Sequence, residues 1–285
     1  MYLIHKGAIW MLIATFFFAL MGTFVKLGGE NFNSTELVFY RSLISLLIIV
    51  GIMRLKKISF SSSYIKLHMA RSTIGFISLL FFFYAINNLP LSTAISLNYT
   101  SPLFVGLLLP FILKRKLNFK IFLMILIGFI GVFFILKPSF HNQSLIAGCV
   151  GILSGLGAGG AYLYVTQLGQ LKEPDARTVF FFTLISTLGS GMLLLNQDIH
   201  IPVISDFYIL LCLGGSATIA QIAITRAYRI GNTLGNASLS YLTIIFSALI
   251  GILFFREMID FFSILGMLLI IGSGIFVSIK QSRFK

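Results

Sequence analysis

Residues 123–136 read LMILIGFIGVFFIL and residues 43–52 read LISLLIIVGI, two stretches of nearly continuous apolar character. A strand of a membrane barrel would instead alternate between apolar and polar residues over about 10 positions. In lipid, a helix satisfies all of its backbone hydrogen-bonding groups within one segment. The two stretches therefore predict transmembrane helices rather than barrel strands.

The rest of the chain has the same character. Of its 285 residues, 58% are apolar and 10% are charged, and the mean hydropathy is +0.99. Ordinary soluble domains are about 45 to 50% apolar and about 25% charged. One membrane crossing needs roughly 20 apolar residues, so the length leaves almost no room for a soluble domain. This excludes most soluble enzyme classes and any large nucleic-acid-binding module.

We expect an all-α integral membrane protein with ten transmembrane helices. The apolar stretches lie at about residues 7–28, 35–54, 67–88, 91–113, 118–136, 145–166, 176–196, 206–228, 233–255 and 260–280. With the N-terminus inside, most of the 21 Lys and Arg residues fall in cytoplasmic ends and loops, Arg71 among them. This bias follows the positive-inside rule. It predicts a multi-pass protein of the plasma (inner) membrane with both termini in the cytoplasm.

The second half of the chain repeats the first. Residues 34–45 align with residues 175–186, which places Val38 on Val179, and a second alignment places Tyr99 on Tyr241. We therefore expect two five-helix repeats, residues 1–140 and 141–285. An odd number of crossings inverts the second repeat, an arrangement common in carriers that work by alternating access. Duplication for stability alone is the simpler alternative.

Several short motifs recur in the order and spacing of one known family. The chain resembles the drug/metabolite transporter (DMT) superfamily, in particular its EamA-type members, and the resemblance covers essentially the whole chain. It implies a carrier of five plus five helices. Two positions depart from the family pattern: Ile244 replaces a second proline and Arg115 replaces a first glutamate. Strict functional symmetry between the halves is therefore not expected. The motifs are residues 36–41 (ELVFYR), 84–85 (YA), 96–102 (SLNYTSP), 238–241 (SLSY) and 256–257 (RE).

Neutral polar and aromatic side chains recur within the predicted helices and are candidates to line a substrate cavity. They would offer hydrogen bonds and aromatic faces without net charge. The alternative is that they hydrogen-bond between helices and hold the bundle together. These candidates for substrate binding are Trp10, Tyr84, Asn98, Tyr99, Tyr162, Gln221, Ser240 and Tyr241.

Arg41 is the one ionisable residue predicted well inside a helix. It could bind a substrate carboxylate or phosphate, or it could be structural and extend outward to lipid headgroups. Glu36 lies five positions away, about 140° around the helix, and is poorly placed to pair with it. No Asp or Glu falls in the middle of a predicted helix, which favours uniport or exchange over proton coupling through a buried carboxylate.

These residues favour a secondary transporter of a small organic metabolite, amino-acid-like or nucleoside-like. A flippase for a lipid-linked or amphiphilic molecule is the alternative, and a non-transporting membrane scaffold is a weaker one. We expect no enzyme activity, no metal site and no cofactor. The partners expected are the substrate and the lipid bilayer, with no nucleic acid, and the chain as a monomer or homodimer. Gly151, Gly155 and Gly159 form a small-residue face of one helix, suited to close packing or to a hinge.

Overall fold

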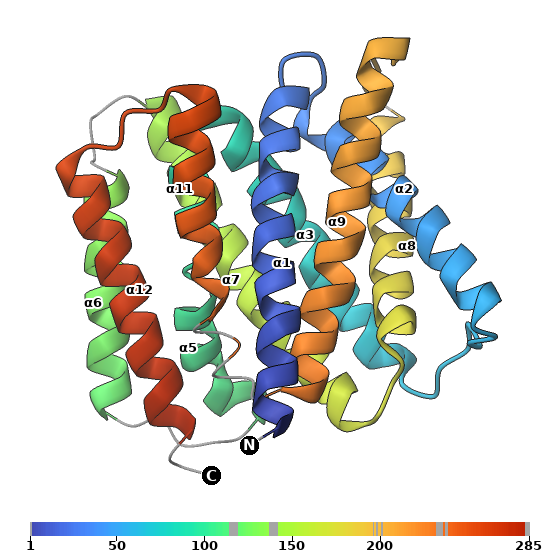
Figure 1. Cartoon of the computed structure of the whole chain (residues 1–285), viewed down its shortest axis with the longest axis horizontal. Coiled ribbons are helices and arrows are strands. Elements are labelled where there is room, and N and C mark those ends of the chain that lie inside the picture. Colours follow the sequence, from blue (N-terminus) through green and yellow to red (C-terminus); the bar gives the residue numbers. More distant parts are fainter. Residues whose placement is uncertain are drawn as a thin grey trace.

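The structure is a computed structural model that describes residues 2–113, 119–136, 142–195, 197, 199–200, 202–231, 236 and 239–282. Within this part of the chain every regular element is a helix, as Figure 1 shows. The helices are α1 (Tyr2–Gly28), α2 (Ser34–Leu55), α3 (Ile65–Asn88), α4 (Leu91–Asn98), α5 (Ser101–Leu113), α6 (Phe119–Leu136), α7 (Asn142–Gln170), α8 (Asp175–Leu194), α9 (Ile204–Ile230), α11 (Leu242–Phe255) and α12 (Phe261–Ser282).

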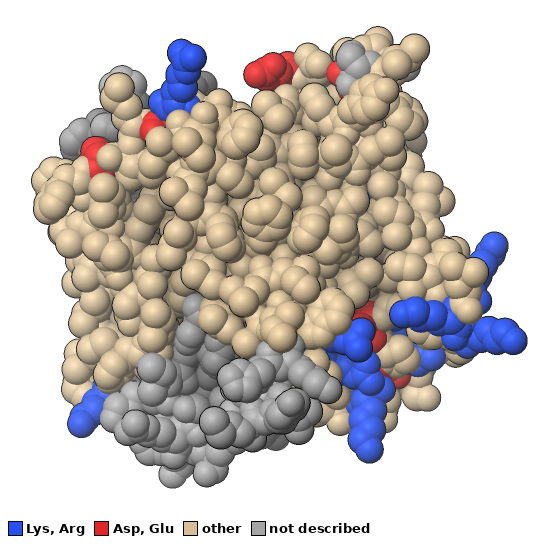
Figure 2. Space-filling view, viewed as in Figure 1, with Lys and Arg blue, Asp and Glu red and all other residues tan. Residues whose placement is uncertain are grey.

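The helices are those of a multi-pass membrane protein. Seven helical stretches in the described residues are long and apolar enough to cross a bilayer, and Leu242–Phe255 and Phe261–Ser273 are shorter apolar helices. Figure 2 shows a broad belt without charge, with Lys and Arg gathered mostly at the lower end, where α1 begins and α12 ends in Figure 1. An uncharged belt between charged ends is the surface that a bilayer requires. The count of ten crossings stays a prediction.

Helices from distant parts of the sequence pack side by side. The most extensive contacts join α1 to α9, α3 to α7, α6 to α12 and α2 to α8. In Figure 1, α6 and α12 lie at one side of the bundle and α2 and α8 at the other, with α1, α3, α7 and α9 between them. The centre of the bundle is therefore built from both halves of the chain.

The stretch that the sequence predicts as one helix over residues 91–113 is two helices, α4 and α5. Pro102 causes the break, because it has no N–H to donate to the carbonyl of Asn98 and its ring crowds that carbonyl. The freed turn is closed locally, since the hydroxyl of Thr100 donates to the carbonyl of Leu97 at 2.7 Å. The break exposes the backbone around Asn98 and Tyr99 to neighbouring helices.

A glycine face of α7 packs against this break. A Cβ atom at Gly155 would lie 2.5 Å from Oγ1 of Thr100 and 2.9 Å from the carbonyl oxygen of Leu97. A Cβ atom at Gly159 would lie 2.8 Å from the carbonyl oxygen of Ser101. Only glycine lets the two backbones come this close, so these residues act in packing.

Two charged side chains fix the connection between α3 and α4. The ammonium group of Lys26 donates to the carbonyl of Leu89 at 2.5 Å, at the C-terminus of α3. The carboxylate of Glu257 accepts from the backbone N–H of Leu91 at 2.5 Å and from the hydroxyl of Ser92 at 3.0 Å, at the N-terminus of α4. Each charge has the sign that the neighbouring helix dipole favours. The start of the broken helix is therefore held in place.

Candidate functional site

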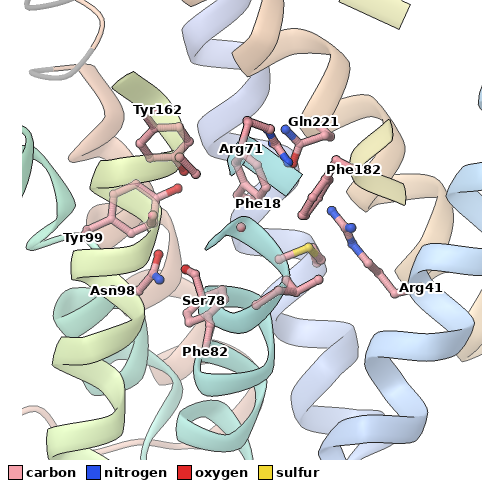
Figure 3. A pocket seen from close by; sticks show the side chains of 15 residues that line it. Phe18, Arg41, Arg71, Ser78, Phe82, Asn98, Tyr99, Tyr162, Phe182 and Gln221 are labelled. Carbon is pink, nitrogen blue, oxygen red and sulfur yellow. The ribbon is translucent and has the colours of Figure 1, made fainter. Parts of the chain in front are cut away.

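A cavity lies in the middle of the bundle, where seven helices from both halves meet. Figure 3 shows its lining side chains. Its volume is about 60 Å³, well below the roughly 300 Å³ of a small-molecule site. The lining comes from α1 (Phe18, Met21), α2 (Arg41), α3 (Arg71, Gly75, Ser78, Leu79, Phe82), α4 and its C-terminal end (Asn98, Tyr99), α7 (Ala158, Ala161, Tyr162), α8 (Phe182) and α9 (Gln221).

Five of the candidate residues line this cavity: Arg41, Asn98, Tyr99, Tyr162 and Gln221. The helix break places Asn98 and Tyr99 there. The amide of Asn98 donates to the hydroxyl of Ser154 at 2.9 Å, which ties the break to α7. In Figure 3, Tyr162, Tyr99, Asn98 and Ser78 form one side of the cavity and the two arginines lie towards the other. The cavity therefore has a neutral polar side and a cationic side.

Three other candidates lie elsewhere. Tyr241 is buried and packs within the main apolar core, and Ser240 beside it is also buried; neither lines the cavity. Tyr241 is the residue directly before α11, and Tyr99, its predicted equivalent in the first half, is the residue directly after α4. Trp10 lies under the guanidinium of Arg226, whose Cζ is 4.6 Å from the ring centroid. These three side chains do not face the central cavity in this conformation.

Tyr84 also points away from the cavity, and 38% of its side chain is exposed. It lies two positions beyond the lining residue Phe82 on the same helix. Two positions correspond to about 200° of rotation at 3.6 residues per turn. The face of α3 that carries Tyr84 is therefore opposite to the face that lines the cavity.

The sequence misplaced Arg71. The charge pattern predicts this residue at the cytoplasmic end of a helix, but it lies almost two turns into α3 and is only 2% exposed. Arg41, on α2, is 1% exposed. The pattern that indicates the position of Arg71 is its spacing from Gly75, Ser78 and Phe82, which places all four on one face of α3. The cavity therefore contains two buried arginines rather than one.

The two arginines share one aromatic ring. The Cζ atom of Arg71 lies 3.9 Å from the centroid of Phe182 and that of Arg41 lies 5.2 Å from it. Figure 3 shows the ring between the two side chains. Gly75 leaves the space for this arrangement, because a Cβ atom there would lie 3.1 Å from Nη1 of Arg71 and 3.1 Å from Phe182. We name this arrangement of Arg41, Phe182 and Arg71 the arginine pair.

Nothing in the described part of the chain neutralises the arginine pair. The Nε and Nη1 atoms of Arg41 and of Arg71 are buried and have no hydrogen-bond partner there. A cation–π contact contributes about 0.5 to 2 kcal/mol. One charged side chain at the centre of a membrane helix costs at least about 2.5 to 3.5 kcal/mol. A single shared ring therefore does not offset two buried guanidinium groups.

Glu36, the acidic residue of α2, and Glu173, which lies between α7 and α8, contact other groups. The carboxylate of Glu36 accepts from the backbone N–H of Asn33 at 2.7 Å and from that of His200 at 2.6 Å. The carboxylate of Glu173 contacts His68 at 3.3 Å and Arg177 at 3.0 Å. Among the residues described, no group of three or more His, Cys, Asp or Glu side chains is arranged to hold a metal ion.

Known proteins resemble this chain over almost its whole length. The sequence model of the EamA-like transporter family matches residues 5–137. A protein of Helicobacter pylori named as an uncharacterized transporter is 31% identical over 281 residues, which cover 96% of this chain and 94% of that protein. The chain belongs to the EamA-like transporter family.

Other relatives of this EamA-like transporter have named substrates. The pseudopaline exporter CntI of Pseudomonas aeruginosa is 29% identical over 97% of each chain. The S-adenosylmethionine uptake transporter of Rickettsia prowazekii is 22% identical over 98% of this chain and 94% of that protein. A crystal structure with 15% identity aligns over 99% of each chain with a TM-score of 0.74, which shows a shared fold. The family and these relatives are transporters, so the chain is a transporter and not an enzyme.

Proposed function

We propose that this EamA-like transporter carries a small organic metabolite across the inner membrane by alternating access, with the central cavity as its binding site. The observation that carries the proposal is the cavity itself, which presents Asn98, Tyr99, Tyr162 and Gln221 in the middle of an apolar bundle. Polar groups at such a depth are costly unless they serve a function or bind one another. The relatives named above support a metabolite as the cargo.

The pattern of helix contacts supports two related halves. We pair each helix of the first half with its predicted equivalent in the second: α1 with α7, α2 with α8, α3 with α9, and α6 with α12. If each helix is replaced by its equivalent, the contact of α1 with α9 becomes the contact of α7 with α3. In the same way, the contact of α2 with α9 becomes the contact of α8 with α3. All four contacts are present. This is the pattern that a two-fold relation between residues 1–140 and 141–285 predicts. The inverted sense of the second half is part of the proposal.

The small volume of the cavity fits one stage of such a cycle. At about 60 Å³ it is too small for a metabolite, so the two halves must move apart to admit one. In inverted-repeat carriers, this motion opens the site to one side at a time. We therefore interpret the structure as a contracted state of the carrier.

Uptake into proteoliposomes tests the proposed function. The purified chain would be screened with a radiolabelled library of amino acids, nucleosides and their conjugates, including S-adenosylmethionine, with uptake and release measured in parallel. We expect saturable uptake of at least one metabolite above that of protein-free vesicles. A chain that moves no member of the library in either direction, while correctly folded, would refute the proposal.

A flippase is the second candidate, favoured by an apolar groove of about 580 Å³ that lies outside the central cavity. The groove is lined mainly by aliphatic side chains of α11, α12 and the segment between them, and its size suits a lipid chain. It shares no lining residue with the central cavity. A flippase would need the two to join, and fluorescent-lipid scrambling assays in the same vesicles separate the two functions.

A further inference from the structure

We propose that the arginine pair is an anion-binding site, and that the metabolite carried through the central cavity is an organic acid or phosphate whose charged group binds between Arg41 and Arg71. This inference rests on the proposed function and adds the chemical class of the substrate. Two separate observations carry it: the Nε and Nη1 atoms of both guanidinium groups are buried without a hydrogen-bond partner in the described chain, and both side chains line the cavity.

The position of each arginine within its helix makes escape to the surface difficult. Arg41 lies seven residues from the start of α2 and Arg71 six residues from the start of α3, which at 1.5 Å per residue is about 10 Å from each helix end. An exposed arginine would extend its guanidinium group into the headgroup region. Both side chains instead stay buried and approach Phe182.

The donors of the arginine pair fit a planar oxyanion. A guanidinium group carries five N–H donors in a fixed fork, and this fork binds the two oxygens of a carboxylate or phosphate together. The fork has two edges, Nε with Nη2 and Nη1 with Nη2, and in both arginines the Nε and Nη1 atoms, one donor of each edge, are buried without a hydrogen-bond partner in the described chain. Gln221 lies beside Arg71 in Figure 3 and adds a neutral polar group at the same place.

The opposite side of the cavity suits the uncharged body of the same molecule. Tyr99 and Tyr162 offer aromatic faces and hydroxyl groups there, and the apolar rings of Phe18 and Phe82 line the same cavity. Planar or aromatic groups pack well against such rings. The cavity is thus matched to a molecule with an anionic end and an aromatic or apolar end.

The test measures ligand-induced thermal stability of the full chain in detergent, which does not require transport. The probes are two matched pairs that differ in charge: phenylacetate against phenylacetamide, and phenyl phosphate against phenol. The variants are Arg41→Gln and Arg71→Gln, with Arg41→Lys and Arg71→Lys as versions that keep the charge. Arg54→Gln, at the exposed end of the same helix as Arg41, is the matched control.

We expect an anionic probe to raise the melting temperature by about 5 °C or more at about 100 times its dissociation constant, and its neutral counterpart to have no such effect. Each glutamine variant should weaken binding about 10-fold to 150-fold, since a hydrogen bond to a charged group is lost. The lysine variants should retain part of it, and Arg54→Gln all of it. Without probe, the glutamine variants should melt at the same or a higher temperature, because an unpartnered buried charge has been removed.

Three outcomes would overturn the inference. The first is that neither anion stabilises the wild type, and the second is that the variants respond to anions as the wild type does. The third is that vesicles of phosphatidylglycerol, but not of phosphatidylcholine, stabilise the protein in an arginine-dependent way and prevent binding of the anionic probes. The arginine pair would then bind a lipid headgroup. If anions bind as expected but no transport is found, only the proposed function fails. If neutral metabolites are transported equally by the glutamine variants, only this inference fails.

Discussion

Replacing Gly155 by alanine should destabilise the protein, although alanine is the better helix former. The new Cβ atom would lie 2.5 Å from Oγ1 of Thr100 and 3.0 Å from the carbonyl oxygen of Asn98. Ordinary contacts of this kind exceed 3.4 Å, and backbone carbonyls in a helix break have little freedom to move. Overpacking at the upper end of its range lowers the free energy of unfolding by about 3 kcal/mol. The better helix propensity of alanine offsets about 1 kcal/mol of this loss. The net loss is about 2 kcal/mol.

Gly160 provides the matched control on the same helix. A Cβ atom at Gly160 would meet its nearest neighbour at 3.6 Å, which is ordinary contact. Gly160→Ala should therefore gain about 1 kcal/mol from helix propensity. In a melting assay that follows monodisperse protein by size-exclusion chromatography, the two variants should differ by at least about 6 °C. Equal melting temperatures, or a more stable Gly155→Ala variant, would show that α7 does not pack against the break as described.

Three further predictions concern orientation, capping and binding. In a background without native cysteines, Lys57→Cys should react with a membrane-impermeant maleimide only from the cytoplasmic side and Met258→Cys only from outside; the reverse result would invert the topology. Glu257→Gln should lower the free energy of unfolding by about 1 to 3 kcal/mol, because the charged cap of α4 is lost, yet keep measurable exchange in vesicles; complete loss of exchange in folded protein would indicate coupling through this carboxylate. Gln221→Ala and Tyr99→Phe should each weaken binding of a transported metabolite about 5-fold to 150-fold in equilibrium dialysis, and unchanged affinity in both would place the site elsewhere.

Membrane insertion and helix positions could be predicted because lipid imposes one requirement along the whole chain. An apolar run such as residues 123–136 has few structural alternatives in a bilayer. The family resemblance is confirmed by the comparisons. The sequence analysis misses the break between α4 and α5, although Pro102 indicates it. A hydropathy profile does not record the loss of one backbone N–H group.

The cavity could be predicted only in part. Asn98, Tyr99 and Gln221 can be identified as polar residues in apolar helices. The direction of a side chain, however, depends on the rotation of its helix about its own axis, and this rotation points Tyr84 away from the cavity. The sequence analysis misses Arg71. The residue lies close enough to a cytoplasmic helix end to be counted among the cytoplasmic positive charges, and that count says nothing of where its side chain points. Hydropathy could not show that Phe182 lies between two arginines, since contacts between α2, α3 and α8 are long-range.

Counterflow in proteoliposomes tests the central claim most directly. Vesicles loaded with an unlabelled anionic substrate, identified in the uptake screen, would be given the same substrate in labelled form, and uptake compared with that of empty vesicles. We expect preloading to accelerate uptake several-fold in the wild type and in Arg54→Gln, and the double variant Arg41→Gln, Arg71→Gln to show no acceleration while remaining folded. Equal uptake in preloaded and empty vesicles, or equal acceleration in the double variant, would contradict alternating access through this cavity.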